Sequence, residues 1–365
     1  MANDASVMTV LGPVPTRELG VVLPHEHLLI DTTTCYFQPP AETSQRALAE
    51  SPVEITKLGL LRRNLFALRD NLVLSDLELA IAEAMEFRKL GGGTVVDVTI
   101  ADIGRDPTAL QAISRRTGLR IVMGCGHYIH LAHPPTLDGD PVEAIAERLI
   151  KELTEGVGET GIRPGIIGEI GTWHPLHPRE EKVLRAAARA QKATGVALSV
   201  HLHVAARKGH DILTILDQEG VDLTRVVLGH LDIAFGHLDT DYEEVLDYHR
   251  SLAARGCYIE YDTCGAEVYA PGGGDVPPFW TALDLTRARA IARLFEQGFG
   301  ERILISHDVF TKTQLLRFGG FGYGHILRDF QHRLREVGLG DAEVRRLLEE
   351  NPQRMLTPEV LARGS

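Results

Sequence analysis

The chain has 365 residues, 44% of them hydrophobic, and a formal net charge of −12. This length allows a large core, and the acidic balance argues against a protein that binds nucleic acid through its phosphates, which normally shows a basic footprint. No stretch reaches the ~20 apolar residues of a membrane span, and the first residues lack the features of a secretory signal, so we expect a cytoplasmic protein with a small-molecule substrate, no nucleic acid and no membrane.

Eight short β-branched runs alternate with amphipathic helical stretches along the chain. The runs cover residues 21–30, 94–100, 119–126, 165–171, 196–203, 225–232, 256–262 and 302–308. One helical stretch is expected to begin at an N-cap Ser75 and end at Gly91, and another to end at Gly195. Eight strand–helix units predict an α/β fold of the (β/α)8 TIM-barrel type, with residues 1–365 forming a single domain. An open, doubly wound sheet is the alternative, but no GxGxxG follows the first strand.

The interval of about 31–74, after the first strand, is long for one loop. It contains TTTCYFQPPAETS and then the helical stretch KLGLLRRNLFALRDN. We therefore expect an insertion here, lying over the barrel mouth or against a partner.

The first strand, VVLPHEHLLID, carries polar residues in an apolar run. Side chains alternate between the two faces of a strand, so His25 and His27 share one face and Glu26 takes the other. Two imidazoles on a buried face are costly without a partner. A metal ion is one such partner; hydrogen bonds from a strand-end histidine pair to loops are the other.

Further candidate ligands stand near the carboxyl ends of other predicted strands, where the chemistry of this type of barrel gathers. They are Glu169, His201, His230 and Asp308. Together with His25 and His27 they suit two divalent ions of the zinc type, held roughly 3.5–4 Å apart by a bridging carboxylate. Each residue alone could be structural, but the joint pattern favours a binuclear metal site.

The order of these motifs resembles the amidohydrolase superfamily, and within it the phosphotriesterase-related family. The resemblance spans nearly the whole chain, through LGPVPTRELGVVLPHEHLLID, LSVHLH, VVLGHLD, LISHDVF and VRRLLEENPQRML. It implies that His25, His27 and Asp308 bind one ion and that His201 and His230 bind the other. It also implies Zn²⁺, with Mn²⁺ or Co²⁺ as alternatives, and a homodimer, for which the apolar 58–68 segment is a candidate interface.

The fourth strand, GIIGEIGT, departs from the organophosphate hydrolases of the family, which carry a carboxylated lysine as the bridge between the ions. Gly168 occupies the lysine position and Glu169 follows one residue later. A one-residue slip turns a side chain to the other face, so Glu169 bridges only if the strand bulges or shifts register, which Gly168 makes easy. The chain is then similar to the phosphotriesterase homology proteins, which use Glu as the bridge. The alternative is that Glu169 points outward.

The expected reaction is hydrolysis by a metal-bridging hydroxide, formed because two divalent ions lower the pKa of a shared water. Asp308 would take the proton and pass it to the leaving group, or act as a ligand alone. Tyr128 would donate a hydrogen bond to the substrate oxygen, or be a rim aromatic. Arg207 and Lys208 could neutralise a substrate anion, although surface charge is the commoner explanation.

The preferred function is hydrolysis of a small ester, lactone or amide, because the lysine bridge is missing. Phosphoester or phosphotriester hydrolysis is the alternative within the family. A metal-dependent lyase or isomerase, and a ligand-binding protein without activity, are the alternatives from other classes.

Overall fold

The computed structural model describes residues 5–203, 206–236, 241–271 and 278–358. Eight parallel strands lie side by side in the order β14-β11-β10-β9-β8-β7-β6-β3. They are β3 (Val21–Glu26), β6 (Gly92–Asp97), β7 (Arg120–Cys125), β8 (Ile166–Gly171), β9 (Leu198–His201), β10 (Val226–Leu228), β11 (Tyr258–Tyr261) and β14 (Ile303–Ile305). Each falls within or beside one of the eight predicted runs, and the (β/α)8 barrel is confirmed.

Hydrogen bonds between β3 and the residues that follow β14 join the first and last strands. The backbone N–H of His25 donates to the hydroxyl of Ser306 at 3.1 Å. The N–H of Asp308 donates to the carbonyl of His25 at 3.4 Å. These two bonds link β3 and β14 at the end of the barrel that carries the polar residues.

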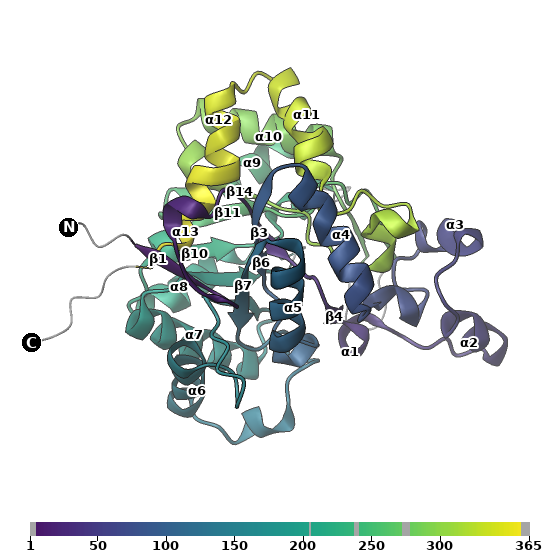
Figure 1. Ribbon diagram of the computed structural model, residues 1–365, viewed down its shortest axis with the longest axis horizontal. Helices are drawn as coiled ribbons and strands as arrows, with labels where there is room; N and C mark the ends of the chain where they lie inside the picture. The colour runs from purple at the N-terminus through teal and green to yellow at the C-terminus, as the bar shows by residue number, and fades with distance from the viewer. Residues whose placement is uncertain (1–4, 204–205, 237–240, 272–277, 359–365) are drawn as a thin grey trace, which may run out of the picture.

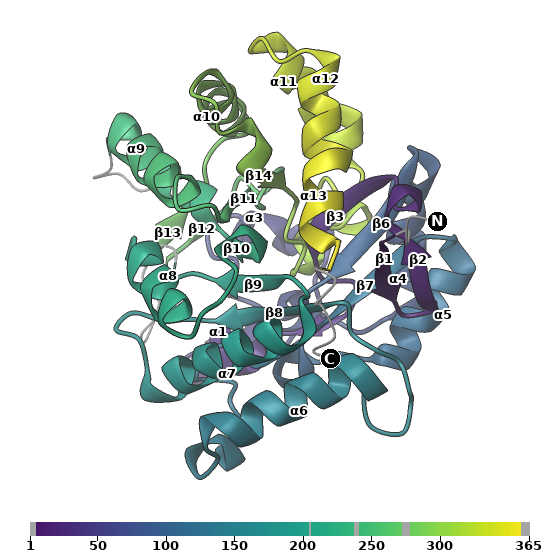
Figure 2. The ribbon, with the colours of Figure 1, turned by 90° about the vertical axis from the view of Figure 1, so that its left-hand side faces the viewer.

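Helices surround the strands, one segment after each strand (Figure 2). They are α4 (Leu77–Lys89), α5 (Pro107–Thr117), α6 (Val142–Glu155), α7 (Pro178–Thr194), α8 (Gly209–Gln218), α9 (Tyr242–Ala253), α10 (Asp284–Glu296) and, after β14, α11 (Gln331–Glu336), α12 (Asp341–Arg345) and α13 (Asn351–Leu356). The predicted N-cap Ser75 is wrong by one residue: the Asp76 carboxylate accepts from two backbone N–H groups of the first turn of α4. Gly195 ends α7 as predicted, with φ 71°.

Alternation along the strands builds two apolar layers. Val96 lies in the cluster inside the barrel, whereas its neighbour Val95 packs in the larger cluster with the helices. The inner cluster draws one side chain from every strand or its first flanking residue: Val22, Val96, Val122, Ile166, Ala197, Val227, Tyr258 and Leu304. This filled interior is a packed floor beneath the polar residues rather than a pore.

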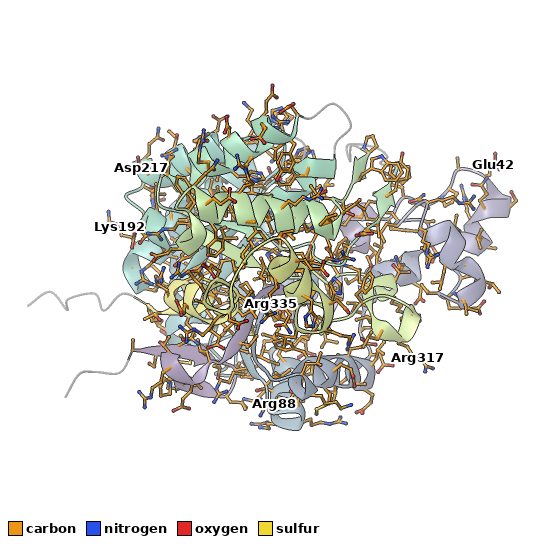
Figure 3. The ribbon with its side chains drawn as sticks, turned by 90° about the horizontal axis from the view of Figure 1, so that it is seen from above. Glu42, Arg88, Lys192, Asp217, Arg317 and Arg335 are labelled. Atoms are coloured by element: carbon orange, nitrogen blue, oxygen red, sulfur yellow. The ribbon has the colours of Figure 1, made fainter. Side chains whose placement is uncertain are left out.

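An antiparallel pair brackets the predicted insertion. Strands β4 (Ile30–Asp31) and β5 (Val73–Leu74) pair with each other, and α1 (Thr33–Tyr36), α2 (Thr43–Ala49) and α3 (Leu58–Leu61) lie between them in sequence. In Figure 1 α2 and α3 project from one side of the barrel, opposite the hairpin of β1 (Ser6–Thr9) and β2 (Gly12–Pro15). Figure 3 shows Glu42 at the outer end of this insertion.

The apolar 58–68 segment packs largely within the chain. Leu61, Leu65 and Leu68 are at most 2% exposed, and two of them form a cluster with Val53. Its apolar character is explained by this internal packing, and the homodimer remains a prediction. Among the described residues, no helix combines the length and apolar character needed to cross a bilayer.

Candidate metal centre

Six side chains predicted as metal ligands converge at the carboxyl ends of the barrel strands. None of them is more than 8% exposed: His25, His27, Glu169, His201, His230 and Asp308. They come from β3, β8 and β9 or from the residues that follow β3, β10 and β14. The barrel thus collects residues that are up to 283 positions apart in the sequence into one buried cluster.

Glu169 reaches this cluster because strand β8 shifts register at Gly168. Ile167 pairs with Leu198 and Ile170 pairs with Val200. The chain therefore advances three residues along β8 while it advances two along β9, which is one extra residue in β8. Gly168 has φ 124°, and a Cβ at this position would collide with the carbonyl oxygen of Ser199. The expected distortion is present, and it turns the Glu169 side chain toward the histidines.

The Glu169 carboxylate lies between two sets of imidazole nitrogens. Oε2 is 3.2 Å from Nδ1 of His201 and 3.4 Å from Nε2 of His230. Oε2 is also 3.4 Å from Nε2 of His25, and Oε1 is 3.4 Å from Nε2 of His27. Asp308 also lies in the cluster, with Oδ1 3.2 Å from Nε2 of His27 and Oδ2 3.7 Å from Nδ1 of His230. All the ligands that the resemblance implies therefore surround Glu169, while the division between two ions remains a prediction.

A second row of side chains orients the imidazoles from behind. Nδ1 of His25 lies 3.1 Å from Glu260, and Nδ1 of His230 lies 3.0 Å from Asp262. Nδ1 of His27 lies 2.9 Å from the hydroxyl of Thr99. Such partners fix the ring orientation and the tautomer of a metal-binding histidine. The sequence reasoning did not single out Glu260, although its alternation with Asp262 in YIEYD places both on one face.

The cluster has a negative electrostatic potential that favours a cation. Burial alone would lower the pKa of His25, but Glu169, Glu260 and Asp262 raise it well above the usual value. Burial would also lower the pKa of His230, but Asp262 and Glu169 raise it well above the usual value. Burial would raise the pKa of Glu169, but the surrounding imidazoles of His201, His230 and His25 hold it well below its usual range.

One buried atom of the cluster has no hydrogen-bond partner in the described part of the chain. It is Nε2 of His25, whose other ring nitrogen is already engaged by Glu260. A buried imidazole nitrogen without a partner, aimed at two carboxylates, is costly unless it binds a ligand. Imidazole nitrogens and carboxylate oxygens are donors that suit zinc-type ions. The residues present therefore fit a divalent metal centre.

Tyr128 lies at the edge of this cluster and is linked to a second tyrosine. Its hydroxyl is 3.2 Å from Nδ1 of His201 and 2.8 Å from the hydroxyl of Tyr36. Burial raises the pKa of both phenols well above the usual value, so both are neutral donors at neutral pH. Tyr36 was not a sequence candidate, because it belongs to α1 in the insertion, whose position over the site no local pattern reveals.

A pocket opens over the cluster and ends on Glu169 and Asp308. Its wall is made mainly by Ile30, Tyr36, Leu65, Phe66, Tyr128, Trp173, Ile233, Val268 and Phe310. Arg207 and Lys208 are not among the residues that line it; they lie 3.8 Å from Glu244 and 3.0 Å from Asp211 respectively. For these two residues the surface-charge explanation fits the structure better than contact with a substrate.

Together, the barrel and the cage of imidazoles and carboxylates at its carboxyl ends define the class of metal-dependent barrel hydrolases. The sequence profile described as "Phosphotriesterase family" matches residues 5–356. The protein belongs to this family and is a hydrolase.

Individual relatives agree with this assignment. The chain is 36% identical over 360 residues to an N-acetyltaurine hydrolase of Tetraodon nigroviridis, covering 98% of this chain and 99% of that protein. The crystal structure of a resiniferatoxin-binding protein from Rhodobacter sphaeroides superposes with a TM-score of 0.90 at 40% identity, covering 96% and 95% of the two chains. A phosphotriesterase homology protein from Escherichia coli, complexed with phosphate in its active site, gives a TM-score of 0.73 at 27% identity, covering 93% and 99%.

Proposed function

We propose that this protein is a binuclear metal-dependent hydrolase that cleaves the acyl bond of a small amide or ester, lactones included. The observation that carries the proposal is the Glu169 carboxylate, which lies within 3.4 Å of four imidazoles. His25, His27 and Asp308 would hold one ion, His201 and His230 the other, and Glu169 would span both. Zinc is the proposed metal, since the donors are nitrogen and oxygen atoms in a closed cage.

Divalent ions bound here would lower the pKa of water and polarise the acyl oxygen. In the overall reaction, water adds its oxygen to the acyl carbon, the C–N or C–O bond breaks, and a proton goes to the leaving amine or alcohol. Asp308 lies at the floor of the pocket, where it can take a proton from the attacking water and give it to the leaving group. Its N–H bond to His25 holds it beside the cage.

Tyr128 is the proposed donor to the acyl oxygen. Its hydroxyl faces His201 on the side of the proposed second ion, and Tyr36 can accept or donate on the other side of the same hydroxyl. A neutral phenol in a dry wall stabilises negative charge that develops on oxygen without reorganising. The aromatic wall of the pocket limits the access of bulk water to this point.

The acyl bond is favoured over a phosphoester by two observations. The bridge is a glutamate rather than a lysine, and relatives that match nearly the full chain are named N-acetyltaurine hydrolases, whose named substrate is an amide. Phosphoester hydrolysis is the second candidate, since a more distant relative has phosphate in its active site.

The test is a hydrolysis screen of zinc-loaded protein against matched acetyl amides, acetyl esters, lactones and phosphotriesters. We expect kcat/KM for the acyl compounds to exceed that for phosphotriesters by about 100-fold or more. Oxygen from labelled water should enter the carboxylate product, which separates a hydrolase from a lyase or isomerase. Asp308→Asn is the control that should abolish turnover, and elemental analysis should find about two ions per chain. Fast turnover of phosphotriesters alone would reject the acyl assignment.

A further inference from the structure

The described lining of the pocket above the candidate metal centre carries no fixed positive charge. Among the described residues that line it, none is Lys or Arg. The internal segments left undescribed, 204–205, 237–240 and 272–277, contain no Lys or Arg in their sequence either. An anionic group on a substrate would therefore lose its hydration here without gaining an ion pair, which is costly.

One buried cation lies behind the wall, but it is already neutralised. Arg287 is fully buried and donates to Thr263, which lines the pocket, at 2.6 Å. The same guanidinium is 2.6 Å from Asp232 and 2.9 Å from Asp284. Because these two carboxylates neutralise the guanidinium charge, Arg287 offers no binding site for an anion in the pocket.

The charge of the metal centre is offset in the same way. Two divalent ions would carry four positive charges, and the cage and its outer partners include four carboxylates: Glu169, Glu260, Asp262 and Asp308. All four are buried. The centre can hold an acyl oxygen, but its net field gives little attraction for a second anionic group several ångströms further up the pocket.

Three polar side chains of the wall already form hydrogen bonds within the protein. Gln314 accepts from the N–H groups of Phe310 and Thr311 and donates to the carbonyl of Asp308 at 2.7 Å. Thr281 accepts from the N–H of Val268 at 2.8 Å, and the hydroxyl of Thr263 donates to Asp232 at 2.5 Å. These groups cannot bind a polar ligand without giving up an internal bond.

What remains for a ligand is an apolar and aromatic surface. The ring of Tyr36 stacks on Phe66 with centroids 5.2 Å apart and planes at 9°, and Trp173 meets the ring of His203 edge-on at 4.8 Å. Besides Tyr128, which the proposed function assigns to the acyl oxygen, Nδ1 of His203 offers a hydrogen-bonding group, since it is buried without a partner among the described residues. A mainly apolar lining with a few convergent polar groups is typical of small-molecule pockets, and here none of these groups offers a charge to pair with an anion.

Building on the proposed function, we infer that the substrate is an uncharged amide or ester with an apolar group beyond the acyl bond. The pocket discriminates against substrates whose leaving group carries a sulfonate or carboxylate. In this respect the specificity differs from that named for the N-acetyltaurine hydrolases, although the chain shares about a third of its residues with one of them.

The experiment compares three acetyl amides on the zinc-loaded protein: N-acetyl-3-methylbutylamine, N-acetyltaurine and the uncharged methyl sulfone analogue of N-acetyltaurine. We expect kcat/KM for the apolar amide to exceed that for N-acetyltaurine by about 100-fold, with the sulfone between them. The corresponding methyl ketones, which carry CH₂ in place of NH and cannot be hydrolysed, give a second readout by calorimetry, with the same order of affinity.

A variant that adds a cation to the wall should change the selectivity. Val268 is half-buried in the wall, so Val268→Lys can place its ammonium at the pocket, and the preference for the apolar amide should narrow about fivefold or more. Ile55→Lys adds the same charge at a residue that is 85% exposed and outside the lining, and should keep the wild-type ratio.

The outcomes separate this inference from the proposed function. Equal or better turnover and binding of the sulfonate compounds would overturn the inference and leave acyl hydrolysis standing. Failure to bind any of the three ketones would do the same. A different outcome is that the protein binds the uncharged ketones more tightly than the sulfonate ketone and hydrolyses no amide or ester. That result would overturn the proposed function and leave only the pocket's preference for uncharged ligands.

Discussion

The carboxylate of Glu26 accepts a 2.6 Å hydrogen bond from Nδ1 of His307, the residue before Asp308. The same carboxylate accepts from the hydroxyl of Ser306 and from the backbone N–H groups of His307 and Val309. Glu26 is fully buried on the face of β3 opposite to His25 and His27. One strand therefore supplies two candidate ligands on one face and, on the other, the anchor for the segment that carries a third. Asp308 itself has φ 49°, a strained conformation that this anchor helps to hold.

Glu26→Gln should weaken the metal centre without removing a ligand. A glutamine amide presents an N–H to one of the donors that Glu26 now satisfies, so the Asp308 segment should shift. We expect metal affinity and kcat/KM to fall about 10- to 100-fold, measured by chelator competition and steady-state kinetics. Glu83→Gln is the matched control, since Glu83 is a buried carboxylate that accepts from the N–H groups of Leu316 and Arg317. It should lower stability only, and an equal loss of metal affinity would contradict the assignment.

The paired hydroxyls of Tyr36 and Tyr128 should act together. Tyr128→Phe removes the proposed donor to the acyl oxygen, and we expect kcat to fall about 10- to 1000-fold with little change in KM. Tyr36→Phe removes only the 2.8 Å partner of that hydroxyl, and a loss of a few fold is expected. The double variant should resemble Tyr128→Phe alone, because the two residues share one function. Additive losses would show that Tyr36 acts independently of Tyr128.

Metal affinity should rise with pH across the neutral range. The pKa values of His25 and His230 lie well above the usual value in the metal-free protein, so both imidazoles carry protons that a metal ion must displace. The affinity for Zn²⁺ should increase about tenfold per pH unit for each displaced proton, measured by chelator competition at pH 6, 7 and 8. Calorimetry in buffers of different ionisation enthalpy should detect the released protons. Asp262→Asn removes a cause of both raised pKa values, so the Zn²⁺ affinity of this variant should depend less on pH. A pH-independent affinity of the wild type would contradict the prediction.

A buried histidine outside the metal centre should make stability depend on pH. Burial lowers the pKa of His249 to about 3 from the ordinary value of 6.5. The unfolded chain therefore binds a proton between about pH 6.5 and 3 that the folded protein excludes, so stability is full above this window and falls as pH drops through it. From pH 7 to pH 5 the free energy of unfolding should fall by about 2 kcal/mol through this group.

The variant His249→Asn keeps a polar atom near the hydroxyl of Tyr261, now 2.7 Å from Nδ1, and has no proton to exclude. Denaturant unfolding with chelator present should show that His249→Asn is less stable than wild type at pH 7. The difference in the free energy of unfolding between the two proteins should shrink at pH 5. His332→Asn, at an exposed histidine, should keep the wild-type pH dependence. If the difference in the free energy of unfolding between wild type and His249→Asn is the same at both pH values, His249 is not the cause of the pH dependence.

Local patterns located the barrel strands and most of the candidate site. The periodicity of short apolar runs is a strong signal when it repeats eight times, and polar residues near the ends of buried strands stand out against it. The strand ends were less certain: the run at 225–232 becomes a strand of only three residues, Val226–Leu228. His230 lies beyond it with φ 59°, where side-chain direction no longer follows strand alternation.

By itself, the sequence determined the fold class, the family and the six residues that converge at the barrel mouth, because strand periodicity and motif order are local properties of the chain. Only the tertiary structure decided which way Glu169 faces, since that depends on how Gly168 packs against Ser199 on the next strand. It also decided that Tyr36 reaches Tyr128, and that Arg207 and Lys208 pair away from the pocket. These are distances between segments far apart in the chain, which the packing of the whole barrel sets and no single stretch encodes.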